Sequence, residues 1–145
     1  MSEILWCADN GDGTYRNPVL YCDYSDPDAI CVNGTYYLTA STFNYVPGLP
    51  ILTSRDLVNW KLVNYAVKNI PEARYAAPQH AQGIWAPAIR FQNGRFYIYY
   101  GMPDEGIYMV STENPLGDWD TPVLVKPGKG LIDPCPFWAD DGRAY

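Results

Sequence analysis

Three segments of this chain repeat one order of residue types: a residue before proline, a short apolar run, a turn ending in glycine, then aromatic residues. The residue–proline pairs are Asp26-Pro27, Ala86-Pro87 and Asp133-Pro134, and the turn glycines are Gly34, Gly94 and Gly142. The first two turns read Asn-Gly between apolar runs, which favours a tight β-hairpin because both residues tolerate positive φ. Each segment is therefore predicted to form a hairpin.

A second repeated element follows the first two hairpins. Residues 51–60 and 108–119 both read as a strand ending near serine, a polar turn, and a tryptophan that opens another strand. The unit thus has four strands, and its turn glycines recur after 60 and then 48 residues. Four-stranded units at such a period are typical of a β-propeller. We expect blade one at about 17–67, blade two at about 84–126 and the start of blade three at 131–145.

The composition agrees with an all-β fold, because 13 prolines and 12 glycines separate short runs rich in Tyr, Ile, Val, Phe and Thr. A propeller needs at least four blades around its channel. Residues 1–145 are therefore expected to be the N-terminal part, about two and a half blades, of a single incomplete propeller domain. Exposed blade edges would favour self-association.

Charge and hydropathy exclude several classes of protein. The net charge is −6, and the ten basic residues are scattered singly, which argues against a nucleic-acid partner. No run approaches the roughly 18 apolar residues of a membrane helix, so no membrane partner is expected. Residues 1–9 show no basic region followed by an apolar core, hence no visible signal peptide. A cytoplasmic protein and a processed exported one both fit this N-terminus.

Cysteine spacing gives no support for a metal site. The four cysteines form no C-x-x-C pair, and His80 is the sole histidine, so a zinc site is not predicted. We interpret the cysteines as small buried residues with free thiols. One disulfide is compatible with the sequence, which does not select the pair. The cysteines are Cys7, Cys22, Cys31 and Cys135.

The repeat alignment locates a candidate site. In a propeller the first strand of each blade is usually innermost, so Asp26, Ala86 and Asp133 should lie at one height around the channel. Two carboxylates would then converge on one channel mouth, as glycosidic bond hydrolysis requires. Asp-Pro is also a common turn opener with a local cap. A purely structural cap should recur in every repeat, yet one position holds alanine.

An ordered set of segments resembles glycoside hydrolase family 43. The segments are 17–20, 24–30, 37–43, 54–60, 83–87 and 130–134, and the resemblance extends from about residue 17 to 145. It implies a five-bladed propeller and the inverting hydrolysis of plant cell-wall β-xylosides or α-L-arabinofuranosides. Related propeller hydrolases of fructosides also use Asp-Pro motifs, but they retain configuration and their nucleophile motif has another context.

The resemblance also implies roles. Asp26 matches the general base, and Asp133 matches the aspartate that raises the pKa of the general acid and orients it. That acid is a glutamate of the following blade, beyond this chain, so the chain alone is expected to be inactive. The other glutamates, Glu3, Glu72, Glu105 and Glu113, lie outside the motif. No cofactor is expected, although part of the family carries a channel calcium whose ligands would come largely from later blades.

Three residues are candidate sugar contacts, namely Trp85, Phe43 and His80. Trp85 precedes Ala86 and resembles a sugar-site tryptophan of the family, with blade packing as the alternative role. Phe43 resembles another sugar-site position, and His80 lies in the preceding loop, where a solvated role is equally open. For Asp28 a turn-capping role is favoured. A non-catalytic carbohydrate-binding propeller is the alternative function; an interaction propeller of the WD or kelch kind lacks its repeat signature here.

Overall fold

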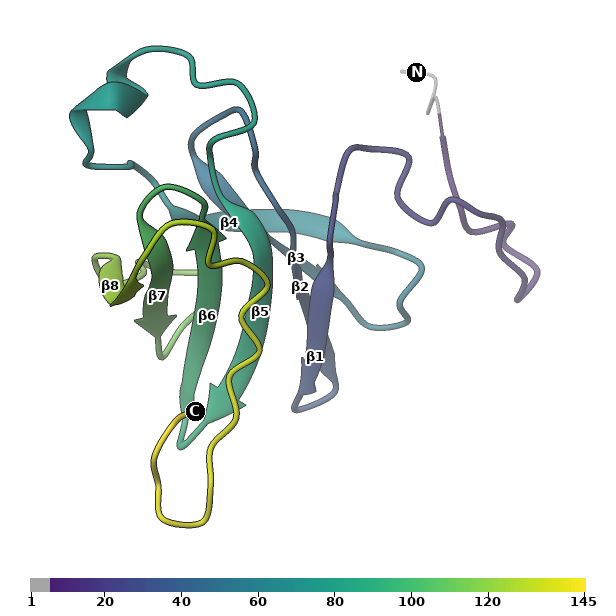
Figure 1. Cartoon of the computed structure of the whole chain (residues 1–145). Coiled ribbons are helices and arrows are strands. Elements are labelled where there is room, and N and C mark those ends of the chain that lie inside the picture. The colour runs from purple at the N-terminus through teal and green to yellow at the C-terminus, as the bar shows by residue number, and fades with distance from the viewer. Residues whose placement is uncertain (1–5) are drawn as a thin grey trace.

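The computed structural model describes residues 6–145 and contains two four-stranded antiparallel sheets (Figure 1). The first sheet has the order β1 (Asp28–Val32), β2 (Thr35–Thr39), β3 (Gly48–Ser54) and β4 (Lys61–Val67). The second has the order β5 (Trp85–Gln92), β6 (Arg95–Met102), β7 (Gly106–Thr112) and β8 (Val123–Pro127). The 3₁₀ turn η1 (Ala73–Ala76) lies between them. The predicted all-β class is confirmed.

The hairpins form where the Asn-Gly pairs predicted them. Asn33 and Gly34 have φ values of 50° and 72°, and Asn93 and Gly94 have values of 50° and 80°. Positive φ at both central residues gives a turn whose twist matches that of the flanking strands. The pairs Val32–Thr35 and Gln92–Arg95 close the two hairpins and fix the register of both sheets.

The third repeated segment returns along the second sheet and ends in a loop below it (Figure 1). Its hairpin is limited to an isolated bridge between Trp138 and Ala144. Trp138 packs against Tyr97 and Tyr99 of β6, with ring centroids 5.1 Å and 6.2 Å apart. Aromatic packing thus holds the start of this repeat against blade two.

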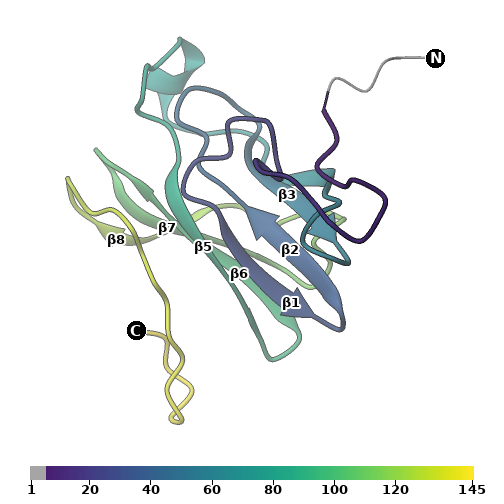
Figure 2. The same cartoon turned by 90° about the vertical axis from the view of Figure 1, so that its right-hand side faces the viewer.

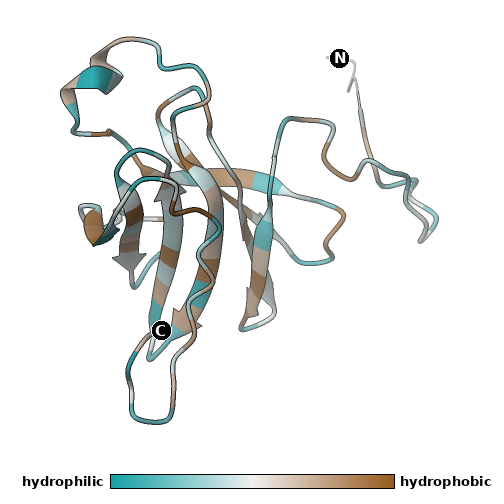
Figure 3. Cartoon of the chain, viewed as in Figure 1, coloured by the Kyte–Doolittle hydropathy of each residue, from teal (hydrophilic) through white to brown (hydrophobic). Residues whose placement is uncertain are grey.

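A shared core joins the two sheets. Figure 2 shows β1 beside the second sheet, and β1 and β2 both contact β5. Leu49 and Ile51 of β3 are fully buried in one cluster with Ile89 and Ile98 of the second sheet. Buried and half-buried side chains alternate along the first part of β6, and the apolar ones face the core. Hydrophobic residues appear as brown bands on the strands in Figure 3. Each blade therefore buries its neighbour's face.

The N-terminal prediction falls partly on residues 1–5, and Glu3 lies there too; both are outside the described residues. The prediction of buried cysteines is wrong, because all four are exposed, with free thiols. Cys31 lies on the exposed side of β1, and the others lie outside the strands. Whether residues 1–145 belong to one larger catalytic domain stays a prediction.

Within residues 6–145 no helix is long and apolar enough to cross a membrane.

Candidate active site

The three residues that precede the repeat prolines share an unusual backbone. Their φ values are 47° for Asp26, 33° for Ala86 and 54° for Asp133. Asp26 comes just before β1, and Ala86 is the second residue of β5. Asp133 follows Ile132, whose backbone lies against Gly101 near the end of β6. All three therefore lie at the same end of the sheets, as the alignment of the repeats predicts.

Asp26 is held by two hydroxyl groups. Ser41 Oγ donates to Asp26 Oδ2 at 2.9 Å, and Ser25 Oγ donates to the same oxygen at 3.1 Å. Ser41 Oγ also accepts a hydrogen bond from the backbone N–H of Ala86 at 2.8 Å. Ser41 is buried, whereas Asp26 is exposed. Both hydrogen bonds go to one oxygen, so the carboxylate is fixed in direction while the residue stays exposed, as a water-activating base requires.

The seam between the sheets runs through the same region. Thr42 and Ile84 form a bridge with backbone hydrogen bonds of 2.9 Å and 3.0 Å. Gly83 donates its N–H to Phe43 O at 2.8 Å. The segment after Ser41 is therefore paired with the segment before Trp85, and this pairing brings the predicted base and the predicted sugar contacts to one seam.

Phe43 and Trp85 meet across this seam. Their ring centroids are 5.3 Å apart with an interplanar angle of 81°, an edge-to-face pair. Both residues are half-buried.

A cavity of about 180 Å³ adjoins Phe43. It is lined by further aromatic rings and side-chain amides, including Tyr45, Tyr75 and Gln79. Aromatic faces with nearby amide groups suit a sugar, which has apolar C–H faces and polar hydroxyls.

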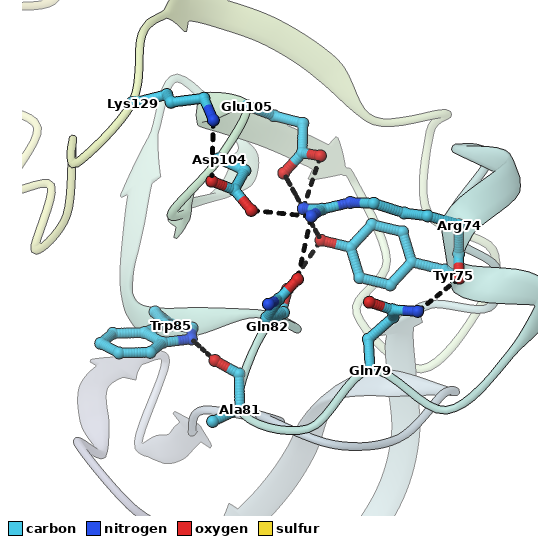
Figure 4. A network of polar contacts seen from close by, with 9 residues as sticks. All are labelled: Arg74, Tyr75, Gln79, Ala81, Gln82, Trp85, Asp104, Glu105 and Lys129. Atoms are coloured by element: carbon cyan, nitrogen blue, oxygen red, sulfur yellow. Dashed lines mark hydrogen bonds and ion pairs between the residues drawn. The ribbon is translucent and has the colours of Figure 1, made fainter.

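Figure 4 shows the polar network that fixes the loop before Trp85. Arg74 donates to Asp104 Oδ2 at 2.7 Å and to Gln82 Oε1 at 2.9 Å, and it pairs with Glu105 at 2.7 Å. Trp85 Nε1 donates to Ala81 O at 3.2 Å. The β6–β7 turn of blade two therefore anchors the loop that supports the Trp85 indole.

Two glutamates outside the family motif make polar contacts that tie this loop to blade two. Glu105 pairs with Arg74, and Glu72 Oε1 accepts a hydrogen bond from the Tyr108 hydroxyl at 2.6 Å. Burial and the negative charge of Glu105 raise the pKa of Tyr75 to about 12. Burial and the hydrogen bond to Glu72 also raise the pKa of Tyr108. Both phenols thus stay protonated at neutral pH.

Asp28 does not cap a turn, contrary to the favoured interpretation. Its Oδ2 accepts hydrogen bonds from Ile89 N at 2.9 Å and from Arg90 Nη1 at 2.6 Å, both on blade two. Burial lowers the pKa of Arg90, but the hydrogen bond and charge of Asp28 outweigh it and raise that pKa overall. Arg90 stays charged. Tertiary packing of two blades decides this pairing, which local turn chemistry does not reveal.

The remaining predicted residues are less constrained. Asp133 and His80 are both exposed, and neither side chain makes a hydrogen bond within the described part of the chain. The structure thus links Asp26 to Ala86 through Ser41 and pairs Phe43 with Trp85. The roles of all five predicted site residues stay predictions. Among residues 6–145 no group of three or more His, Cys, Asp or Glu side chains is placed to hold a metal ion.

Sequence reasoning missed Ser41 and Arg90. Ser41 lies in the segment 37–43 that resembles the family, but its contacts with both blades form only where the two sheets meet. The one sequence signal for Ser41 is its place just after the second strand of a hairpin, because that end of the hairpin lies beside the Asp-Pro motif. Arg90 carried no signal beyond a charged residue inside an apolar run.

Comparisons with known proteins agree with this geometry. The family model "Glycosyl hydrolases family 43" matches residues 15–145. A putative β-xylosidase of Xylanibacter ruminicola is 45% identical over 139 residues, covering 95% of this chain and 26% of that protein. The non-reducing end α-L-arabinofuranosidase BoGH43B of Bacteroides ovatus is 37% identical over 149 residues, covering 97% and 27%.

Solved structures give the same result. The GH43 BlXynB protein of Bacillus licheniformis superposes with a TM-score of 0.79 at 32% identity, covering 90% of this chain and 28% of that one. The xylan β-1,4-xylosidase of Bacillus halodurans gives 0.77 at 31% identity, covering 89% and 26%. The chain therefore spans about a quarter of the length of the relatives it matches. With the family model covering nearly all of its residues, the chain belongs to glycosyl hydrolase family 43.

Proposed function

We propose that the protein containing this chain hydrolyses the glycosidic bonds of xylosides or arabinofuranosides in plant cell-wall glycans, with inversion. The observation that carries the proposal is the tethered Asp26. Its carboxylate accepts hydrogen bonds from Ser25 and Ser41, stays exposed, and lies at the end of the sheets where Trp85 meets Phe43. Relatives named β-xylosidase and α-L-arabinofuranosidase support both substrate classes.

The proposed mechanism uses carboxyl groups and water, without a cofactor. Asp26, ionised, would hold a water molecule and take its proton as that water attacks the anomeric carbon. A glutamate outside this chain would protonate the leaving oxygen from the opposite face of the sugar. Asp133, ionised nearby, would raise the pKa of that glutamate by like-charge repulsion and keep it protonated. Trp85 and Phe43 would contact the sugar ring, with His80 at the loop beside it.

The test is an assay of the full-length protein on aryl β-xyloside and aryl α-L-arabinofuranoside. Asp26→Asn should lower kcat by about 10²- to 10⁴-fold, because the amide fills the same space but takes no proton. Asp23→Asn is the control, since Asp23 is an exposed aspartate three residues away. Asp133→Asn should move the alkaline limb of the pH–rate profile to lower pH, because the acid loses its negative neighbour.

The outcomes separate the alternatives. Nuclear magnetic resonance should show the inverted anomer as the first product. Full-length protein that binds xylo-oligosaccharides without turnover would instead indicate a carbohydrate-binding propeller. Near-normal kcat in Asp26→Asn would show that the base is another residue.

We also propose that the isolated chain self-associates through the exposed edge strand β8, where Val123, Leu124 and Val125 are exposed. Light scattering would show a mass above the 16.3 kDa of the monomer; a monomer would contradict this proposal.

A further inference from the structure

Arg90 touches the first segment of each of the other two repeats. It belongs to β5, and its side chain is 30% exposed. Arg90 Nη1 donates to Asp28 Oδ2 at 2.6 Å, and Arg90 Nη2 donates to Cys135 Sγ at 3.3 Å. One guanidinium of the middle blade therefore contacts blade one and the start of blade three together.

The two partners hold equivalent positions in the repeats. Asp28 is two residues after Asp26, and Cys135 is two residues after Asp133. A single proline, Pro27 or Pro134, separates each partner from its predicted catalytic aspartate. Because proline fixes its own φ, a contact that holds the partner limits where the backbone of the aspartate can lie. The equivalent residue of blade two is Ala88, whose methyl group offers no polar partner. The guanidinium therefore contacts the residue two positions after each predicted catalytic aspartate.

The hydrogen bond between Arg90 and Asp28 is strong and directional. A hydrogen bond between ionised groups at 2.6 Å is short, and the same Asp28 oxygen also accepts the Ile89 N–H at 2.9 Å. The planar guanidinium reaches Asp28 and Cys135 from two different nitrogens at once. A lysine ammonium is a single point charge and does not reproduce that fork.

We propose that Arg90 is a positioning residue that sets the placement of Asp26 relative to Asp133 through its contacts with Asp28 and Cys135. This inference rests on the proposed function. Inverting hydrolysis requires a fixed gap for water between the base and the sugar, and the acid's neighbour must stay at a fixed distance from the acid. Because misplacement by about 1 Å can cost 10²-fold in rate, a clamp beside both residues acts on kcat without touching substrate.

The test compares Arg90→Lys with Arg95→Lys in the full-length protein. Arg95 is a matched control: its side chain is 32% exposed and pairs with Asp120 at 2.6 Å, but all its partners lie within blade two. Arg90→Lys should lower kcat about 10- to 100-fold with little change in KM, and it should shift the limbs of the pH–rate profile. Arg95→Lys should leave kcat and the profile unchanged.

Substitutions of Cys135 provide a second measurement should the Arg90 variant fail to fold. Cys135→Ser retains an acceptor for Arg90 and should keep kcat near the wild-type value, whereas Cys135→Ala removes it and should lower kcat in the same direction as Arg90→Lys. Equal kcat in Cys135→Ser and Cys135→Ala, or an Arg90→Lys variant that loses thermal stability while kcat and the pH profile stay unchanged, would overturn the inference.

The Asp26→Asn variant separates this inference from the function on which it rests. An inactive Asp26→Asn variant together with a fully active Arg90→Lys variant would refute the positioning role of Arg90 and leave the proposed function standing. A wild-type protein without activity, or a fully active Asp26→Asn, would refute both.

Discussion

At the scale of single residues, the position before each repeat proline stores backbone strain. Steric contact with the proline ring normally pushes the preceding residue into extended conformations. Asp26, Ala86 and Asp133 instead adopt φ between 33° and 54°, at a cost of order 1–3 kcal/mol each. The surrounding structure must therefore impose this conformation, and for Ala86 the hydrogen bond from its N–H to Ser41 Oγ is one such constraint.

Ser41→Ala should therefore affect both blades. The change removes one donor from the Asp26 carboxylate and leaves the Ala86 N–H without its partner. We expect a loss of about 1–3 kcal/mol in the free energy of unfolding, together with a fall in kcat. Urea unfolding and steady-state kinetics measure the two effects.

The control for this prediction is Ser25→Ala. Ser25 Oγ donates to the same Asp26 oxygen but has no hydrogen bond to blade two. Ser25→Ala should lower the free energy of unfolding by less than Ser41→Ala does. Equal losses in the two variants would show that the bridge to Ala86 contributes nothing.

The sequence predicted the equivalence of these three positions, because X-Pro and glycine recur at nearly constant offsets. It did not predict the sign of φ at Asp26, since the local rule for residues before proline favours extended backbone. Nor did it predict the Asp28–Arg90 pair, whose members are 62 residues apart and meet only when two blades pack. Local patterns thus identified the candidate residues, and contacts between blades determined their geometry.

At the scale of elements, the hairpins and the connecting loop differ in how they are specified. Asn33-Gly34 and Asn93-Gly94 set their own turns, so the sequence located them directly. The loop between β4 and β5 has no such local signal. It is fixed by Arg74 contacts to Asp104 and Glu105, about thirty residues further along the chain. This loop carries Tyr75, whose environment raises the pKa of its phenol.

Tyr75 should make stability fall in alkaline solution. Burial and the charge of Glu105 raise its pKa to about 12 in the folded protein, against about 10 for an unperturbed tyrosine. Below pH ~10 both states are protonated and the stabilisation is complete. As the pH rises toward about 12, the unfolded chain ionises first and the free energy of unfolding decreases.

Tyr75→Phe isolates this contribution. The variant should be less stable at neutral pH, because the hydrogen bond from Tyr75 to Gln82 O at 2.6 Å is lost. Its deficit relative to the wild type should shrink between pH ~10 and ~12. Tyr15→Phe, at an exposed tyrosine, is the control. A deficit that stays constant across this range would contradict the assigned environment of Tyr75.

At the scale of the whole molecule, the two blades behave as one packed unit joined along a narrow seam. Buried residues of both sheets, including Leu49, Ile51, Ile89 and Ile98, form one cluster. The composition and strand pattern predicted two blades, but not how closely their backbones approach at the seam. That approach depends on Gly83, where a Cβ atom would overlap Thr42 O and lie 2.8 Å from Phe43 O.

Gly83→Ala should therefore push the blades apart where the predicted sugar contacts meet. The added methyl group would clash with backbone atoms, which cannot rotate away as a flexible side chain can. We expect a loss of about 1–3 kcal/mol in the free energy of unfolding, typical of overpacking, and a fall in kcat/KM because Phe43 and Trp85 flank the seam. Gly117→Ala is the matched control, since its nearest contact is the Asn114 side chain at 3.1 Å, which can move. Chemical unfolding and kinetics of both variants test this expectation, and a Gly83→Ala protein as stable and active as Gly117→Ala would show that the seam tolerates a wider separation than the structure indicates.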